Sequence, residues 1–327
     1  MEVSKTLPGS HDICAAVKDV PSRPKVLVLL ATYNGALWLG EQLVSILSQQ
    51  DVDVHVLVGD DVSKDGTLLL LEDKFAGRVS IELMGWSVSS GSAGANFRRL
   101  YLAADVTSFD YVALADQDDI WLGDKLSNAI ACLEHSGSVA YSSAVEAFWA
   151  DGRTKILGQN KTIRAADFLF EGAGQGCTFV IRSAIFVQIQ QFCRHHRIDI
   201  EALHYHDWLI YILVRAWQLP WYFDAQVGMR YRQHAGNEIG SRGGYFAVQK
   251  RVQLIRSGWY RRQVDAAATI YRLAAGNDTK ALRLITLLSH QQAIGRSFRL
   301  SYLLFRGGRR RLIDRLVLVV SAMCGWL

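Results

Sequence analysis

Cysteine is scarce in this sequence and is not paired by spacing. The chain has five cysteines and no Cys-x-x-Cys motif. An odd number without metal-ligand spacing argues against a disulfide scaffold and against a structural zinc cluster. Disulfides persist in oxidising compartments, so this pattern predicts a reducing one. The five residues are Cys14, Cys132, Cys177, Cys193 and Cys324.

Long apolar runs and a secretory signal are also missing. No uncharged stretch reaches the roughly 18 apolar residues of a membrane-spanning helix, and the apolar tail at 316–327 has only about half the length needed. The N-terminus, MEVSKTLPGSHD, lacks the basic start and apolar core of a signal peptide. These absences predict a cytoplasmic protein.

Basic charge is present but localised. The formal net charge is +5, and arginines concentrate in the last third of the chain. Few aromatic residues separate these arginines, which argues against a nucleic-acid partner. Arg309, Arg310 and Arg311 precede the apolar Leu312 and Ile313. This segment fits either peripheral contact with the cytoplasmic face of the inner membrane or a helix packed on the rest of the protein.

Strand and helix patterns alternate along the first half of the chain. Continuous apolar runs predict strands at 25–31, 54–58, 79–84 and 111–115, and helical periodicity predicts helices at 38–50, 68–75 and 95–104. We also expect strands at 139–147 and 178–182 and a helix at 208–216. This order predicts an α/β fold with a mostly parallel, doubly wound sheet, whose ligands bind at the carboxyl ends of the strands.

The chain divides into three predicted regions. Residues 1–23 are polar and mixed, which is typical of a flexible leader. Residues 24–243 contain the predicted sheet and form one catalytic domain. Residues 244–327 are helical in pattern and rich in arginine, and we expect an accessory region there.

Carboxylates follow two of the predicted strands. Asp60 and Asp61 follow the second, and a second acidic run follows the fourth. Carboxylates gathered at one sheet edge repel each other unless a cation lies among them, and oxygen ligands suit Mg²⁺ or Mn²⁺. The alternative is that Asp61 and Ser63 cap the following helix. The second run is Asp116, Gln117, Asp118 and Asp119. The apolar Ile120 and Trp121 follow it, and we expect them to line one side of the cation site.

Together these motifs resemble the family 2 glycosyltransferases, and within them the rhamnosyltransferase branch. The resemblance covers residues 25–240. One departure is Val62, where the family commonly has a small residue, often glycine. The motifs are Thr32-Tyr33-Asn34-Gly35, Glu41-Gln42-Leu43, Ser45-Ile46-Leu47 with Gln49, Asp60-Asp61-Val62-Ser63 with Asp65-Gly66-Thr67, and Ala115-Asp116-Gln117-Asp118-Asp119-Ile120-Trp121.

The resemblance implies a GT-A fold, a C-terminal helical region and a nucleotide-sugar donor. It places Asp60 and Asp61 at the base and ribose, and Asp116 and Asp118 at the metal and diphosphate. His234 is a candidate third metal ligand. The predicted nucleotide-sugar-binding residues are Thr32, Tyr33, Asn34, Asp60, Asp61, Asp116, Gln117 and Arg232.

Inverting transfer also needs a base for the acceptor hydroxyl. Asp207, in His206-Asp207-Trp208, resembles the position of the family's catalytic acid residue, although an aspartate there can equally be a helix N-cap. Arg232 could neutralise the leaving group. The residues predicted to bind the acceptor are Gly174, Gln175, Gly176 and Trp121.

These residues predict an inverting glycosyltransferase. The resemblance implies L-rhamnose from dTDP-rhamnose, with a UDP-sugar as the alternative donor. The expected acceptor is a polyprenyl-linked saccharide or a polysaccharide of the cell envelope, such as O-antigen or capsule. A metal-dependent nucleotidyltransferase and a non-catalytic nucleotide-sugar-binding protein of the same fold remain open.

Overall fold

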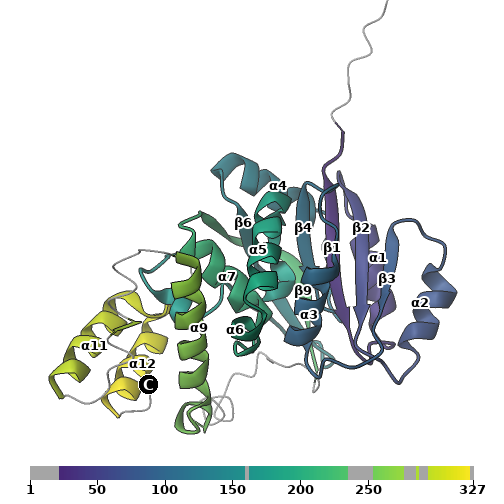
Figure 1. Cartoon of the computed structure of the whole chain (residues 1–327). Coiled ribbons are helices and arrows are strands. Elements are labelled where there is room, and N and C mark those ends of the chain that lie inside the picture. Colours follow the sequence, from purple (N-terminus) through teal and green to yellow (C-terminus); the bar gives the residue numbers. More distant parts are fainter. Residues whose placement is uncertain (1–21, 159–161, 235–252, 276–284, 287–293, 325–327) are drawn as a thin grey trace, which may run out of the picture.

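One mixed sheet of nine strands forms the centre of the protein (Figure 1). The computed structural model describes residues 22–158, 162–234, 253–275, 285–286 and 294–324. Eight strands follow the order β3-β2-β1-β4-β8-β6-β9-β5, and β7 pairs with β6. The strands are β1 Lys25–Thr32, β2 Asp53–Asp60, β3 Ile81–Gly85, β4 Tyr111–Ala115, β5 Ile120–Trp121, β6 Ala140–Trp149, β7 Thr154–Leu157, β8 Val180–Arg182 and β9 Trp221–Gln233.

The first four strands form a parallel half of the sheet. β1 pairs in parallel with both β2 and β4, and β2 pairs in parallel with β3. β8 is antiparallel to β4 and to β6, whereas β6 and β9 run parallel. The prediction of a mostly parallel α/β sheet is therefore confirmed, with antiparallel pairs confined to the second half.

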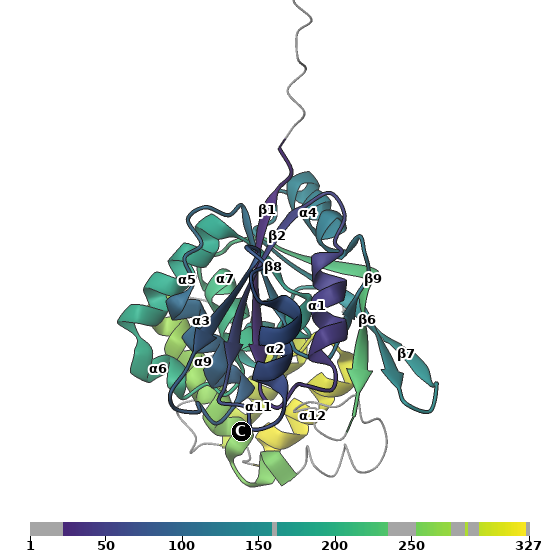
Figure 2. The same cartoon turned by 90° about the vertical axis from the view of Figure 1, so that its right-hand side faces the viewer.

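Helices cover both faces of the sheet because β1 is apolar from Val26 to Ala31 and β4 is buried throughout. Leu27 and Leu29 of β1 point into one core, and Val26 and Val28 point into the other. Figure 2 shows α3 and α5 on one side of the sheet and α1 on the other. The helices on these two faces are α1 Leu39–Leu47, α2 Thr67–Phe75 and α4 Lys125–Ser136 on one, and α3 Ala93–Ala103, α5 Ser183–His195 and α7 His206–Ala216 on the other.

The C-terminal helices extend the second of these cores. Ala267 and Tyr271 of α9 (Trp259–Ala275) are buried in the cluster that contains α7, as are Leu304 and Leu318. Leu304 belongs to α11 (Ile294–Gly307) and Leu318 to α12 (Leu312–Met323), which pack together as a hairpin beside α9 (Figure 1). Among the described residues, no helix has both the length and the apolar character required to cross a bilayer.

The sequence patterns located the first four strands well and missed three others. β5, β7 and β9 were not predicted as strands. β9 carries polar residues such as Asp224 and Arg230 among its apolar ones, so its 13 residues show no clean alternation. The predicted boundary at 243/244 lies outside the described residues, as does nearly all of the predicted leader.

Candidate active site

The loop after β1 is held against the loop after β4 by Gln117. The Gln117 Oε1 atom accepts hydrogen bonds from the Thr32 hydroxyl at 2.6 Å and the Tyr33 amide at 2.8 Å. Its Nε2 atom donates to the Tyr33 carbonyl at 3.0 Å. A Cβ atom on Gly35 would lie 2.4 Å from the same Oε1 atom, so this close approach requires glycine. Three predicted nucleotide-binding residues, Thr32, Tyr33 and Gln117, thus lie together.

The loop after β2 is tied to the loop after β1. Asn34, in the left-handed region at φ 49°, accepts a hydrogen bond from the Lys64 amide at 2.8 Å, and its own amide donates to the Ser63 hydroxyl at 2.8 Å. Asp60 accepts from the Ser63 amide at 2.8 Å and from the Ser63 hydroxyl. Val62 is also left-handed, at φ 64°. A glycine would adopt this conformation without strain.

Asp61 is buried and accepts hydrogen bonds from the loop that precedes α3. Its carboxylate accepts hydrogen bonds from the Ser89 hydroxyl, the Ser90 amide and the Gly91 amide, at 3.0, 2.6 and 3.2 Å. Arg99 lies 3.5 Å away. Asp61 therefore organises a loop, although not the helix cap that the alternative interpretation expected. Contact of Asp60 and Asp61 with a base or ribose stays a prediction.

The loop after β4 concentrates carboxylates in a different way. Ligand atoms of Asp116, Asp119 and Cys177 lie within 4.8 Å of one another. Asp119 is fully buried, and its Oδ2 atom has no hydrogen-bond partner among the described residues. Burial raises the pKa of Asp119 well above its ordinary value, and the nearby Asp118 and Asp116 raise it further. A divalent cation would relieve this repulsion, so the donor set fits Mg²⁺ or Mn²⁺.

Cys177 does not suit such an ion. Burial raises the pKa of its thiol, and the nearby Asp119 and Asp116 raise it further, so the sulfur stays protonated. Thiolates also prefer softer metals than Mg²⁺ or Mn²⁺. The oxygen atoms of the aspartates are therefore the better ligands. Asp119 was not among the predicted site residues, although its place beside Asp118 in an acidic run was a usable signal.

The predicted metal ligands Asp118 and His234 are in direct contact. The His234 Nε2 atom lies 2.6 Å from Asp118 Oδ2, and the imidazole stacks on Trp38 with ring centroids 4.1 Å apart. Arg232 donates to the Asp118 carbonyl at 2.8 Å and to the Glu41 carboxylate. Arg232 thus positions the acidic loop, and its role toward a leaving group stays a prediction.

Trp121 lies inside the protein and does not form an open wall. Its side chain is 3% exposed, and the Lys125 Nζ atom lies 3.5 Å from its ring centroid. Burial lowers the pKa of Lys125 to about 7, an effect that Cys177 and Asp119 oppose. This burial gives no support to Trp121 as an acceptor-binding residue.

Asp207 lies in the first turn of α7, next to the glycine segment. Its Oδ1 atom accepts a hydrogen bond from the Trp208 amide at 2.7 Å. A Cβ atom on Gly176 would lie 2.9 Å from the Asp207 Cβ, so residue 176 must be small. Gly174 has φ 116°, a conformation that side chains rarely adopt. The candidate base and the predicted acceptor loop, which includes Gln175, are therefore neighbours.

His206 lies beside the candidate base and was not among the predicted site residues. Its Nδ1 atom lies 2.5 Å from the Tyr101 hydroxyl, and its ring stacks on Phe97 at 3.9 Å. Burial lowers its pKa to about 3, with a further contribution from Arg98. Asp207 and Asp116 both act on Tyr101, raising a pKa that burial has already raised. The candidate base and the acidic loop thus both influence the same tyrosine electrostatically.

A sheet whose β1, β2 and β4 loops converge, with an acidic rim at their ends, is the architecture of a GT-A nucleotide-sugar transferase. The chain matches the model of "Glycosyl transferase family 2" over residues 27–189. It is 38% identical to "dTDP-rhamnosyl transferase RfbG" of Shigella flexneri over 240 residues, which cover 73% of this chain and 83% of that protein. The chain belongs to glycosyl transferase family 2 and is a glycosyltransferase.

Two further comparisons agree with this assignment. The chain is 26% identical to "UDP-Glc:alpha-D-GlcNAc-diphosphoundecaprenol beta-1,3-glucosyltransferase WfgD" of Escherichia coli, over 56% of this chain and 68% of that protein. S. aureus TarS in complex with UDP superposes with a TM-score of 0.56 at 14% identity, over 92% of this chain and 89% of that one. The likeness to TarS shows that the two proteins share a fold over most of this chain.

Proposed function

We propose that this enzyme transfers L-rhamnose from dTDP-rhamnose, with inversion, to a polyprenyl-linked saccharide during synthesis of a cell-envelope polysaccharide. The observation that carries the donor assignment is the 38% identity to a dTDP-rhamnosyl transferase over 83% of that protein's length. The name of WfgD, which contains diphosphoundecaprenol, supports the class of acceptor. A UDP-sugar is the alternative donor.

The donor would bind across the ends of β1, β2 and β4. Thr32, Tyr33 and Asn34 are already held by hydrogen bonds from the neighbouring loops, so little ordering would accompany binding. Asp60 and Asp61 lie at the end of β2, on the side where a base and ribose would reach. This preorganisation supports a nucleotide at these loops.

Asp116, Asp118 and His234 would hold Mg²⁺ or Mn²⁺, and the carboxyl group of the buried Asp119 lies close to that of Asp116. A bound ion would supply neutralising charge for the diphosphate that leaves. Arg232 holds the Asp118 carbonyl and keeps this loop in place.

Asp207 would act as the base. As the acceptor oxygen forms its bond to the anomeric carbon, the bond from that carbon to the diphosphate oxygen breaks. The acceptor proton passes to the Asp207 carboxylate, and dTDP leaves. The position of Asp207 beside the glycine segment supports this role.

Peripheral membrane contact would use the outer face of α12. Ile313, Val320 and Met323 are exposed on this helix, whereas the side chains of Arg309 and Arg310 turn toward the catalytic domain. An apolar helix face of this kind fits an acyl–headgroup boundary, which is where a polyprenyl-linked acceptor resides. Flotation with phosphatidylglycerol vesicles tests this contact, and unchanged flotation of Ile313→Glu would contradict it.

The decisive experiment incubates purified protein with a panel of nucleotide sugars, including dTDP-rhamnose, and with a polyprenyl-diphosphate-linked saccharide. We expect transfer with release of dTDP and loss of activity in chelator. Release of pyrophosphate would instead identify a nucleotidyltransferase. Nucleotide binding without turnover would identify a non-catalytic protein. Full activity of Asp116→Ala in chelator would remove the metal from the mechanism.

A further inference from the structure

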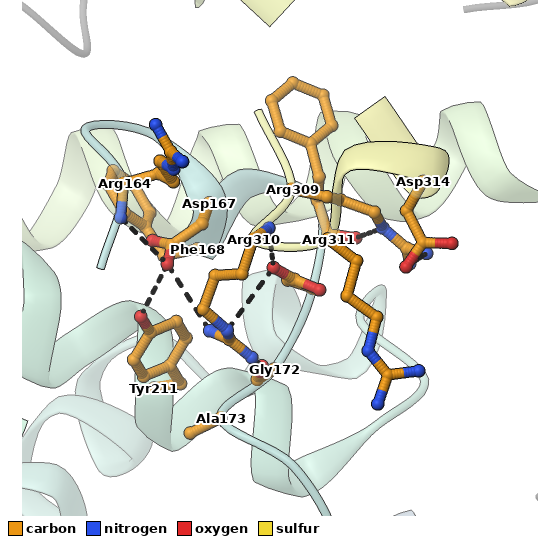
Figure 3. Close-up of polar contacts among 12 residues, drawn as sticks. Arg164, Asp167, Phe168, Gly172, Ala173, Tyr211, Arg309, Arg310, Arg311 and Asp314 are labelled. Atoms are coloured by element: carbon orange, nitrogen blue, oxygen red, sulfur yellow. Dashed lines mark hydrogen bonds and ion pairs between the residues drawn. The ribbon is translucent and has the colours of Figure 1, made fainter. Parts of the chain in front are cut away.

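Residues 166–176, here called the acceptor strap, run from the α11–α12 hairpin to the start of α7. At the hairpin, the Ala166 amide donates to the Gly307 carbonyl at 3.0 Å, and Arg309 Nε donates to the Phe170 carbonyl at 3.0 Å. Arg310 Nη2 donates to the Gly172 carbonyl at 2.6 Å (Figure 3). The basic segment that precedes α12 therefore binds the backbone of the acceptor strap.

The other side of the acceptor strap contacts the residues around the candidate base. The Trp208 indole donates to the Phe168 carbonyl at 2.7 Å. A Cβ atom on Gly172 would lie 3.5 Å from the Trp208 Cα atom, and one on Gly176 would lie 2.9 Å from the Asp207 Cβ atom. A shift of the acceptor strap would thus change the space beside Asp207.

Arg310 holds the acceptor strap from the side of the α11–α12 hairpin, through two ion pairs and a hydrogen bond. It is 5% exposed, and its guanidinium lies 3.4 Å from the Asp167 carboxylate and 3.5 Å from the Glu171 carboxylate. Its backbone amide donates to the Glu171 carboxylate at 2.6 Å. One planar guanidinium therefore engages two carboxylates and one carbonyl at once, which a lysine ammonium cannot reproduce with the same geometry.

Asp167 extends this network to the helix of the candidate base. It is fully buried and accepts hydrogen bonds from Arg215 at 2.6 Å and from the Tyr211 hydroxyl at 3.0 Å. Tyr211 is one turn after Asp207 on α7, so both side chains lie on the same side of that helix. Arg310 consequently contacts the acceptor strap directly and α7 through Asp167.

We propose that Arg310 is a positioning residue for the acceptor: it fixes the acceptor strap relative to Asp207 and so couples the C-terminal hairpin to acceptor binding. This inference rests on the proposed function, because it takes residues 174–176 as the acceptor loop. It assigns Arg310 a role inside the protein and leaves the lipid-facing role to other residues of the hairpin.

The test compares Arg310→Lys and Arg310→Met with Arg311→Met. Arg311 is the adjacent, exposed arginine, and it donates to the Gly158 carbonyl at 3.2 Å. Acceptor KM, dTDP-rhamnose KM, donor hydrolysis without acceptor, and Tm are measured for each protein. We expect the acceptor KM to rise about 10- to 100-fold in both Arg310 variants, since small misplacements at a site carry costs of this size. Donor KM should stay within twofold, and Arg311→Met should match wild type.

Equal changes in donor and acceptor KM, or an unchanged acceptor KM, would overturn the inference. If the Arg310 variants do not fold, Glu171→Gln decides the question, because it weakens the same contact and leaves Arg310 paired with Asp167. An unchanged acceptor KM in that variant would also overturn it. Absence of transfer by the wild-type enzyme would contradict the proposed function instead, so the two failures are distinguishable.

Discussion

Two pairs of adjacent aspartates follow the two strands that flank β1, and the protein uses them differently. After β2, Asp60 accepts hydrogen bonds from Ser63 of its own loop, and Asp61 accepts hydrogen bonds from the loop that precedes α3. After β4, Asp119 has a buried oxygen without a hydrogen-bond partner in the described part of the chain, and its neighbours Asp118 and Asp116 repel it. The first pair holds loops that we propose bind the nucleotide, whereas the second lies in the loop that we propose binds a cation.

The largest expected effect is on the β4 side. Asp116→Asn should lower kcat/KM for transfer about 10⁴-fold, because metal stabilisation of the leaving group is worth several kcal/mol and each 1.36 kcal/mol is tenfold. Steady-state kinetics across a range of Mn²⁺ concentrations measure it. The matched control is Asp124→Asn, just before α4, which should change the rate less than twofold. If the activity of Asp116→Asn stayed within tenfold of wild type, the proposed metal-binding role of the loop after β4 would be contradicted.

The next effect concerns the acceptor side. Asp207→Asn removes the carboxylate that would take the proton while keeping its size, so kcat should fall about 10³-fold, within the range of general-base catalysis. The dTDP-rhamnose KM should stay near wild type. Asp199→Asn on the neighbouring α6 (Arg197–Glu201) is the control, and full turnover is expected. A change in donor KM with unchanged kcat would assign Asp207 to the donor instead.

The sequence located these strand ends but not the use made of each carboxylate. β1 and β4 were predictable because they are uninterrupted apolar runs. The partners of Asp61 lie 28 to 30 residues away in an irregular loop, for which no periodicity exists. Arg310 and Asp167 are 143 residues apart, so a basic triplet that resembled a lipid-binding segment could be assigned to the interior only from the structure.

For stability we expect the opposite order: a substitution in the aspartate pair after β2 should lower the free energy of unfolding more than one in the pair after β4. Asp61→Asn replaces the carboxylate that accepts from four loop donors by a carboxamide, which should cost about 2 kcal/mol of unfolding free energy. Asp119→Asn keeps an oxygen for the Arg232 amide and removes the repulsion with Asp116 and Asp118, so stability should be unchanged or higher. Urea unfolding without added metal measures both. Similar losses in the two variants would show that both pairs are structural.

The buried, neutral imidazole of His206, next to Asp207, should make the free energy of unfolding depend on pH. The pKa of His206 is lowered to about 3, so the folded protein keeps it neutral, while the unfolded chain binds its proton below about pH 6.5. Stability from this residue is complete above pH 6.5 and is lost as pH falls toward 3, by at most about 1.4 kcal/mol per pH unit. His206→Gln should flatten that part of the profile. Urea midpoints at pH 7, 6 and 5 measure it, and parallel profiles would contradict it.

The smallest expected effect lies within the β2 loop itself. Val62 has φ 64°, and a left-handed residue with a Cβ costs about 1–2 kcal/mol, more than the roughly 0.5–1 kcal/mol of extra chain entropy that glycine adds to the unfolded state. Val62→Gly should therefore raise the unfolding free energy by up to about 1 kcal/mol. Val79→Gly, at an exposed residue without positive φ, should lower it slightly. If both variants lose stability, the loop after β2 tolerates valine without strain, and hydrogen bonds to Asp60 and Asn34 alone determine its shape.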